Sequence, residues 1–125
     1  MEQQGARHCA REEAERSFAI FPLVQKRLDL PQEKLAELTQ ISTRTLGRRK
    51  QKGELEPAEW ERVCRFKELL ETAARIIGDE ENAKQWLKTP KRMLGGRTPL
   101  EIAKTESGAR EVFRILGRIE HGVFS

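Results

Sequence analysis

The sequence predicts an all-α protein, with an N-terminal helix-turn-helix domain followed by a small C-terminal helical domain. Three observations predict this class. Apolar residues recur at intervals of three and four along most of the chain, which is the period of an amphipathic helix. Lys, Arg, Glu, Leu and Ala, which favour helix, dominate, and only 5 of the 125 residues are proline. Glycine and proline fall between the periodic stretches, where helices are expected to end. We place the domains at residues 1–70 and 71–125.

Composition limits the classes of function. Hydrophobic residues make up 37% of the chain and charged residues 35%, so each half would bury a thin core, and chains this short often gain stability by oligomerising. The formal charge of +4 permits nucleic-acid binding without requiring it. The two cysteines, Cys9 and Cys64, lie far apart and do not have the spacing of a zinc site. A disulfide framework would need more than two cysteines. No signal-peptide core and no run of 18 apolar residues occurs, which favours a cytoplasmic protein without a membrane partner.

The first half is expected to hold a series of short helices. A helical pattern covers residues 11–28, but Pro22 must either kink this helix or open a second one. A short helix follows over residues 32–39. The next helix is expected over residues 43–51, and Gly53 supplies its stop.

The second half begins with a long helix, which starts at Pro57 and ends before Gly78. About twenty residues at a rise of about 1.5 Å each make it long enough to link two halves. Asp79 is expected to cap a helix that runs to about Leu87, and residues 98–101 have the pattern of a capping box. The last helix is expected over residues 106–121, with an apolar face formed by Ala109, Val112, Phe113, Leu116 and Ile119.

Residues 32–46 have the spacing of a helix-turn-helix. Ala36 is small enough for two helices to cross closely, while Ile41 and Leu46 would fill the angle between them. The start of the second helix reaches base edges in such motifs, and a fork such as that of Arg44 can pair with guanine. The basic residues that follow would neutralise phosphates. The predicted DNA-binding residues are Ser42, Thr43, Arg44, Thr45, Arg48, Arg49, Lys50 and Lys52.

Two features weaken this motif. Gln40 occupies the turn position where glycine is usual, which costs about 1 kcal/mol if the backbone there is left-handed. Gly47, inside the second helix, costs roughly 0.5–1 kcal/mol relative to alanine. The alternative is a helical hairpin whose arginines only form a solvent-exposed face and bind no nucleic acid.

The C-terminal half carries a more specific pattern. It contains Trp86-Leu87, Thr89-Pro90 and the run Leu94-Gly95-Gly96-Arg97-Thr98-Pro99-Leu100, followed by Thr105-Glu106 and Gly108. From about residue 76 to the end, including Arg118 to Gly122, this stretch resembles the C-terminal toxin-binding domain of the Xre/ParS-type antitoxins. The helix-turn-helix, with Arg44-Thr45-Leu46 and Arg48-Arg49-Lys50, resembles the N-terminal half of the same family. The chain departs from the family pattern at Lys91, where asparagine is common, and at Met93, which replaces a smaller residue.

The resemblance implies a function that periodicity alone does not give. It implies the antitoxin of a type II toxin–antitoxin system, whose C-terminal domain dimerises and covers the active-site entrance of a toxin with a RES domain that consumes NAD or transfers ADP-ribose. It also implies that the helix-turn-helix represses the operon. The toxin-binding residues carried over are Trp86, Pro90, Leu94, Gly95, Gly96, Arg97, Thr98, Arg118, Glu120, His121 and Ser125.

Simpler interpretations stand beside these. Trp86 shares a helical face with Ala83 and Leu87 and is more often a core residue than a contact. Acidic residues 79–81 are better explained by the electrostatics of a helix start than by a metal site. No nucleophile–base pair, metal spacing or nucleotide loop predicts an enzyme, and no cofactor is expected. The alternative function is a free-standing transcriptional regulator whose C-terminal domain dimerises or senses a ligand.

Overall fold

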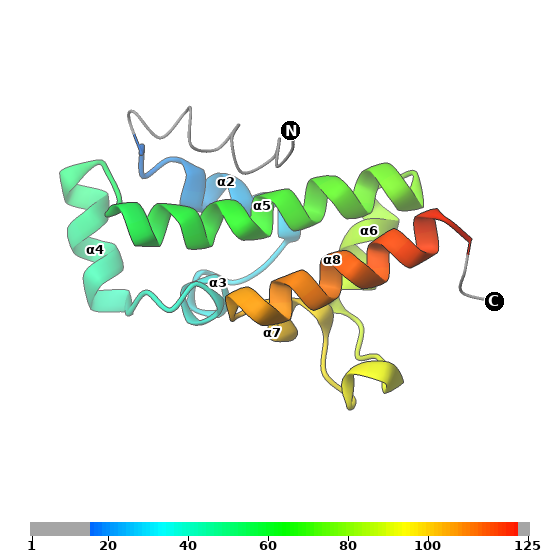
Figure 1. Cartoon of the computed structure of the whole chain (residues 1–125). Helices are drawn as coiled ribbons and strands as arrows, with labels where there is room; N and C mark the ends of the chain where they lie inside the picture. Colours follow the sequence, from blue (N-terminus) through cyan, green and yellow to red (C-terminus); the bar gives the residue numbers. More distant parts are fainter. Residues whose placement is uncertain (1–15, 123–125) are drawn as a thin grey trace. The chain divides into compact units, whose positions relative to one another are not determined.

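The computed structural model describes residues 16–122, which form helices joined by short turns (Figure 1). Among these residues there is no strand, and the only β-type pairings are isolated bridges, such as that between Ser17 and Glu54. The chain divides into two compact units, one that runs to Glu68 and one that starts at Leu69. The boundary falls inside helix α5.

The first unit opens with α2 (Ile20–Leu28). This helix is shorter than the helix expected over residues 11–28, of which residues 11–15 lie outside the described part. Residues 16–19 precede the helix in a turn, and Pro22 lies in its first turn. Proline is tolerated there because the amide hydrogen it lacks would have no partner within the helix. Of the two possibilities that Pro22 left open, it therefore opens a helix.

Helices α3 (Gln32–Leu38) and α4 (Thr43–Lys52) follow close to their expected positions. Between them, the buried Thr39 hydroxyl donates to the carbonyl of Leu35 at 2.7 Å, which satisfies a polar group that would otherwise be left unpaired. Gln40 has a φ of 59°, so the turn does use the left-handed conformation that normally favours glycine. Ile41 and Leu46 are both buried, as expected for residues that fill the angle of the motif.

Helix α5 (Pro57–Ile77) starts at the expected proline. Its buried residues recur every three or four positions through both units: Trp60, Val63, Phe66, Leu70 and Ala73 are all at most 3% exposed. Cys64 is also buried, with 4% exposure.

The second unit contains α6 (Glu80–Lys88), a single 3₁₀ turn η1 (Arg92–Leu94), α7 (Pro99–Ile102) and α8 (Glu106–Glu120). The capping box predicted at the start of α7 is confirmed, because Thr98 Oγ1 accepts from the amide of Glu101 and Glu101 Oε1 accepts from the amide of Thr98. In α8 a Cβ on Gly108 would lie 1.7 Å from the backbone carbonyl oxygen of Ile102. The approach of α8 to α7 therefore requires glycine at this position.

The apolar face of α8 differs from the expected one at three positions. Its buried residues are Ala109, Val112, Ile115 and Leu116, whereas Phe113 and Ile119 are half-buried. Ile115 is buried although the expected face did not include it. The buried stripe is wide enough to include both Ile115 and Leu116.

Within residues 16–122, no helix combines the length and the apolar character that crossing a lipid bilayer requires.

Candidate nucleic-acid and partner interfaces

Helix α4 presents a basic face to solvent. The Ser42 side chain caps it, since Oγ accepts a hydrogen bond from the amide of Thr45 at 3.1 Å. Leu46 is the buried residue of this helix, while Thr45 and Arg49 are half-buried. The other residues predicted to bind DNA are exposed: Ser42, Thr43, Arg44, Arg48, Lys50 and Lys52.

Arg44 and Arg48 are the best placed of these residues. They lie four residues apart, so they share one face of the helix. Within the described part of the chain, neither side chain has a hydrogen-bond or ion-pair partner. Lys52, by contrast, lies 3.9 Å from Glu56. An exposed pair at that distance is worth little and leaves the ammonium group available.

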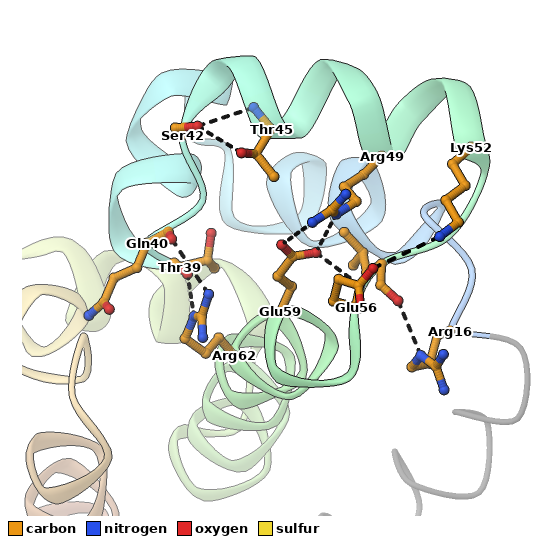
Figure 2. A network of polar contacts seen from close by, with 11 residues as sticks. Arg16, Thr39, Gln40, Ser42, Thr45, Arg49, Lys52, Glu56, Glu59 and Arg62 are labelled. Atoms are coloured by element: carbon orange, nitrogen blue, oxygen red, sulfur yellow. Dashed lines mark hydrogen bonds and ion pairs between the residues drawn. The ribbon is translucent and has the colours of Figure 1, made fainter.

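Arg49 has a different environment from its neighbour Arg48. Its Nε and Nη2 donate to Glu59 Oε1 and Oε2 at 2.8 and 3.0 Å, and the two side chains are only 18% and 11% exposed (Figure 2). Such a two-point pair fixes both side chains. Arg49 thus ties α4 to the first turn of α5. Its guanidinium group is engaged within the fold, which distinguishes it from the exposed residues predicted to bind DNA.

The pair also shifts both ionisations. Burial alone would raise the pKa of Glu59, but hydrogen bonds from Arg49 and from the amide of Glu56, with the charges of Arg49 and Arg62, outweigh it and lower that pKa below its ordinary value. The hydrogen bond to Glu59 raises the pKa of Arg49 above its ordinary value. Both groups are therefore charged near neutral pH.

A second contact holds the turn of the motif. Arg62 on α5 donates from Nε to the carbonyl of Thr39 at 2.6 Å, and its Nη2 lies 3.5 Å from the carbonyl of Gln40 (Figure 2). These carbonyls follow the end of α3, where no helical partner is available. Sequence reasoning missed Arg62 and Glu59 because both lie on a later helix. Glu59, three residues after Glu56 and two after Pro57, carried the weak signal of a helix start.

In the second unit, the segment between α6 and α7 forms a closed, basic loop. The amide of Lys91 donates to the carbonyl of Arg97 at 3.0 Å, and that of Gly96 donates to the carbonyl of Lys91 at 2.9 Å. The predicted turn at Gly95 and Gly96 uses φ angles of 69° and 83°, which glycine adopts without strain. From Lys88 to Arg97 every charged residue is basic. We call residues 89–98 the basic loop.

Some side chains of the basic loop anchor it to the fold, and others are exposed at its tip. Lys91 Nζ lies 4.7 Å from the centroid of the half-buried Trp86 ring, a cation–π contact that anchors the loop to α6. Burial lowers the pKa of Lys91 below its ordinary value. Met93 is 58% exposed, and among the described residues it and Leu23 are the large hydrophobic side chains in the exposed class. The sequence singled out Met93 only as a departure from the family pattern.

The structure places the remaining predicted toxin-binding residues in two groups. Pro90, Gly95, Gly96 and Arg97 are exposed on the basic loop, whereas Leu94 and Thr98 are half-buried and support it. Arg118, Glu120 and His121 are exposed at the end of α8, where Glu120 pairs with Arg75 of α5 at 2.8 Å, and Ser125 lies outside the described residues.

The acidic residues at the start of α6 act as a helix start. Asp79 Oδ1 and Oδ2 accept from the amides of Glu81 and Asn82, each at 3.3 Å. In the described part of the chain, no three His, Cys, Asp or Glu side chains gather as metal ligands would.

Comparison with known proteins identifies both units. The model of the antitoxin Xre-like helix-turn-helix domain matches residues 13–66, and that of the antitoxin Xre/MbcA/ParS C-terminal toxin-binding domain matches residues 72–122. Proteins named antitoxin Xre are similar to the chain. The Yersinia enterocolitica protein is 40% identical over 98 residues, 77% of this chain and 66% of that protein. The Photorhabdus laumondii protein is 41% identical over 87 residues, which cover 68% of this chain and 59% of that protein.

A third relative, antitoxin Xre of Pseudomonas putida, is 31% identical over 83 residues, which cover 66% of this chain and 52% of that protein. The chain thus spans less than two thirds of the length of these relatives. The two domain models still account in order for the helix-turn-helix and for the helical unit that follows it. The chain therefore belongs to the Xre/ParS-type antitoxin family.

Proposed function

We propose that the chain is the antitoxin of a type II toxin–antitoxin system. Its second unit binds a cognate toxin and covers the entrance of that enzyme's active site. The observation that carries this proposal is the match of residues 72–122 to the toxin-binding domain model, within which the basic loop lies. The toxin is a RES-domain enzyme that consumes NAD or transfers ADP-ribose, the partner implied by the family resemblance.

The basic loop is well suited to the partner contact. Internal hydrogen bonds and the Trp86–Lys91 contact order it before any partner binds, so little conformational entropy is lost on association. Methionine and arginine are enriched in protein interfaces, and Met93 with Arg92 and Arg97 offers an apolar tip between positive charges. We expect Met93 to enter an apolar pocket on the toxin, and the arginines beside it to contact acidic residues at the rim of that pocket.

The first unit binds operator DNA and represses the operon that encodes both proteins. This part of the proposal is supported by the match of residues 13–66 to the helix-turn-helix model and by the exposed Arg44 and Arg48 on α4. A homodimer would place two copies of α4 on two half-sites, as in other proteins with this motif. The proposed domains are the two compact units that meet between Glu68 and Leu69.

Co-expression of the tagged chain with the product of the adjacent reading frame tests the proposal. We expect a stoichiometric complex on affinity purification and sizing, and growth arrest when the neighbour is expressed alone. Met93→Asp should weaken the complex, because it puts a carboxylate at the apolar tip. Leu23→Asp, at the comparably exposed position in α2, should leave the complex unchanged.

A lone dimer and a harmless neighbour would instead favour a free-standing regulator. Equal losses in the two variants would remove the basic loop from the proposed interface.

A further inference from the structure

Gly47 is a helical glycine that the fold does not require. It is the fifth residue of α4, it is exposed, and its φ is not positive. A Cβ at this position would meet no atom within 4 Å. Since glycine inside a helix is destabilising relative to alanine, this position weakens α4 without any gain in packing or backbone geometry that the described residues reveal.

The position of Gly47 on α4 is specific. The inner side of the helix is marked by Leu46, which is buried, and by Arg49, which is held by Glu59. At about 100° per residue, Gly47 lies about 160° around the helix from Arg49 and about 100° from Leu46. It is therefore on the solvent side of α4, beside Arg44 and Gln51. Its neighbours on that side, three or four residues away and all exposed, are Thr43, Arg44, Lys50 and Gln51.

The width of the DNA major groove makes the lack of a side chain at Gly47 relevant to DNA binding. A helix with its side chains is about 10–12 Å across, and the major groove is about 12 Å wide, so a helix fills the groove. A side chain added at Gly47 would then stand between the helix backbone and the groove and hold the helix away from it. Every charged residue of α4 is basic, so no charge on the helix opposes a close approach to DNA.

We propose that Gly47 sets the depth at which α4 enters the major groove. Without a side chain there, the helix backbone approaches the base edges closely, and Arg44 and Arg48, which lie together on one side of Gly47, reach them. This inference rests on the DNA binding proposed above. It assigns to Gly47 a positioning role that is distinct from the charge of its neighbours.

The test compares stability with DNA affinity in the full chain. The variants are Gly47→Ala and Gly47→Gln, and the matched control is Gly117→Ala, since Gly117 is another helical glycine whose Cβ would meet nothing within 4 Å. The probes are a duplex from directly upstream of the gene and a scrambled duplex of equal length and composition. Binding is measured by fluorescence anisotropy at fixed salt, and Tm by calorimetry.

We expect both alanine variants to raise Tm by about 2–5 °C, because alanine is the better helix former. Gly47→Ala should nevertheless weaken binding to the upstream duplex by about tenfold, and Gly47→Gln by more, while weak binding to the scrambled duplex is kept. Gly117→Ala should bind both probes as the wild type does. A role confined to folding would move Tm and affinity in the same direction.

Each other outcome decides against the inference. Wild-type affinity in a stabilised Gly47→Ala protein would overturn the role of Gly47 alone. A lowered Tm in that variant would show that the glycine serves the fold. Equal affinity of the wild type for both duplexes would overturn the proposed operator binding and the inference with it.

Discussion

Two adjacent arginines on α4 have different roles because a helix turns by about 100° per residue. Arg48 points to solvent, whereas Arg49 reaches Glu59 and is half-buried. Reversing the charge of both residues would place a carboxylate against Glu59 and would unsettle the fold together with any DNA contact. Single substitutions separate the two effects.

Arg48→Gln should weaken binding to the upstream duplex and flatten its salt dependence, because one phosphate contact fewer releases about one counterion fewer. The slope of log K against log salt should become shallower by about 0.9, with Tm unchanged. Anisotropy titrations at several salt concentrations measure this. Lys26→Gln, which removes an exposed charge from α2, is the control. An unchanged slope in Arg48→Gln would exclude this arginine from the DNA contact.

Glu59→Gln should destabilise the first unit, because it leaves the half-buried Arg49 guanidinium without its counter-charge. We expect the free energy of unfolding to fall by about 1–3 kcal/mol near neutral pH, less than for a fully buried pair. The pKa of Glu59 is lowered by folding, so its contribution is present above the unfolded pKa of about 4.3 and is lost as pH falls through the folded value. Urea titrations from pH 7 to pH 3 should show wild type and variant converging in acid. A constant difference would contradict this account.

At the scale of elements, capping residues and periodicity predicted where most helices lie. Pro57, Asp79, Thr98 and the turn after Leu38 carried signals within a few residues of the boundary, so they could be recognised locally. The contacts of Glu59 and Arg62 could not, because their partners lie 10 and 23 residues away. The proposed partner surface rests on the family resemblance. The isolated bridge between Lys91 and Arg97 that closes the basic loop depends on backbone geometry, which the sequence pattern does not reveal.

Helix α8 contains two glycines with opposite expected roles. Gly108→Ala should destabilise the protein by about 1–3 kcal/mol or more, since its Cβ would lie 1.7 Å from the rigid backbone oxygen of Ile102. Gly117→Ala should stabilise it by about 0.5–1 kcal/mol, because the added methyl group meets nothing within 4 Å. Thermal unfolding of the two variants beside the wild type measures both. Shifts of the same sign would show that the packing of α8 against α7 is not as described.

At the scale of the whole molecule, two compact units carry two proposed activities. The residues proposed to contact DNA lie before Glu68, and those proposed to contact the toxin lie after Leu69. Each unit has its own buried residues, including Phe21 and Leu35 in the first and Leu87 and Leu116 in the second. Changes confined to the surface of one unit should therefore leave the activity of the other intact.

Removal of residues 118–125 should impair toxin neutralisation and leave DNA binding intact. The truncation deletes Arg118, Glu120, His121 and Ser125, which the family resemblance places in the partner contact. It also deletes the half-buried Ile119 and the Arg75–Glu120 pair, so the shortened protein must first be shown to unfold cooperatively in a thermal scan.

A second truncation, which removes only residues 123–125, keeps that pair and isolates the contribution of Ser125 and its two neighbours. Growth rescue on co-expression with the toxin, measured beside anisotropy on the upstream duplex, separates the two activities. Full rescue by the folded shorter chain would remove the end of α8 from the interface and leave the basic loop as the remaining contact, whereas weakened DNA binding would show that the two units do not act independently.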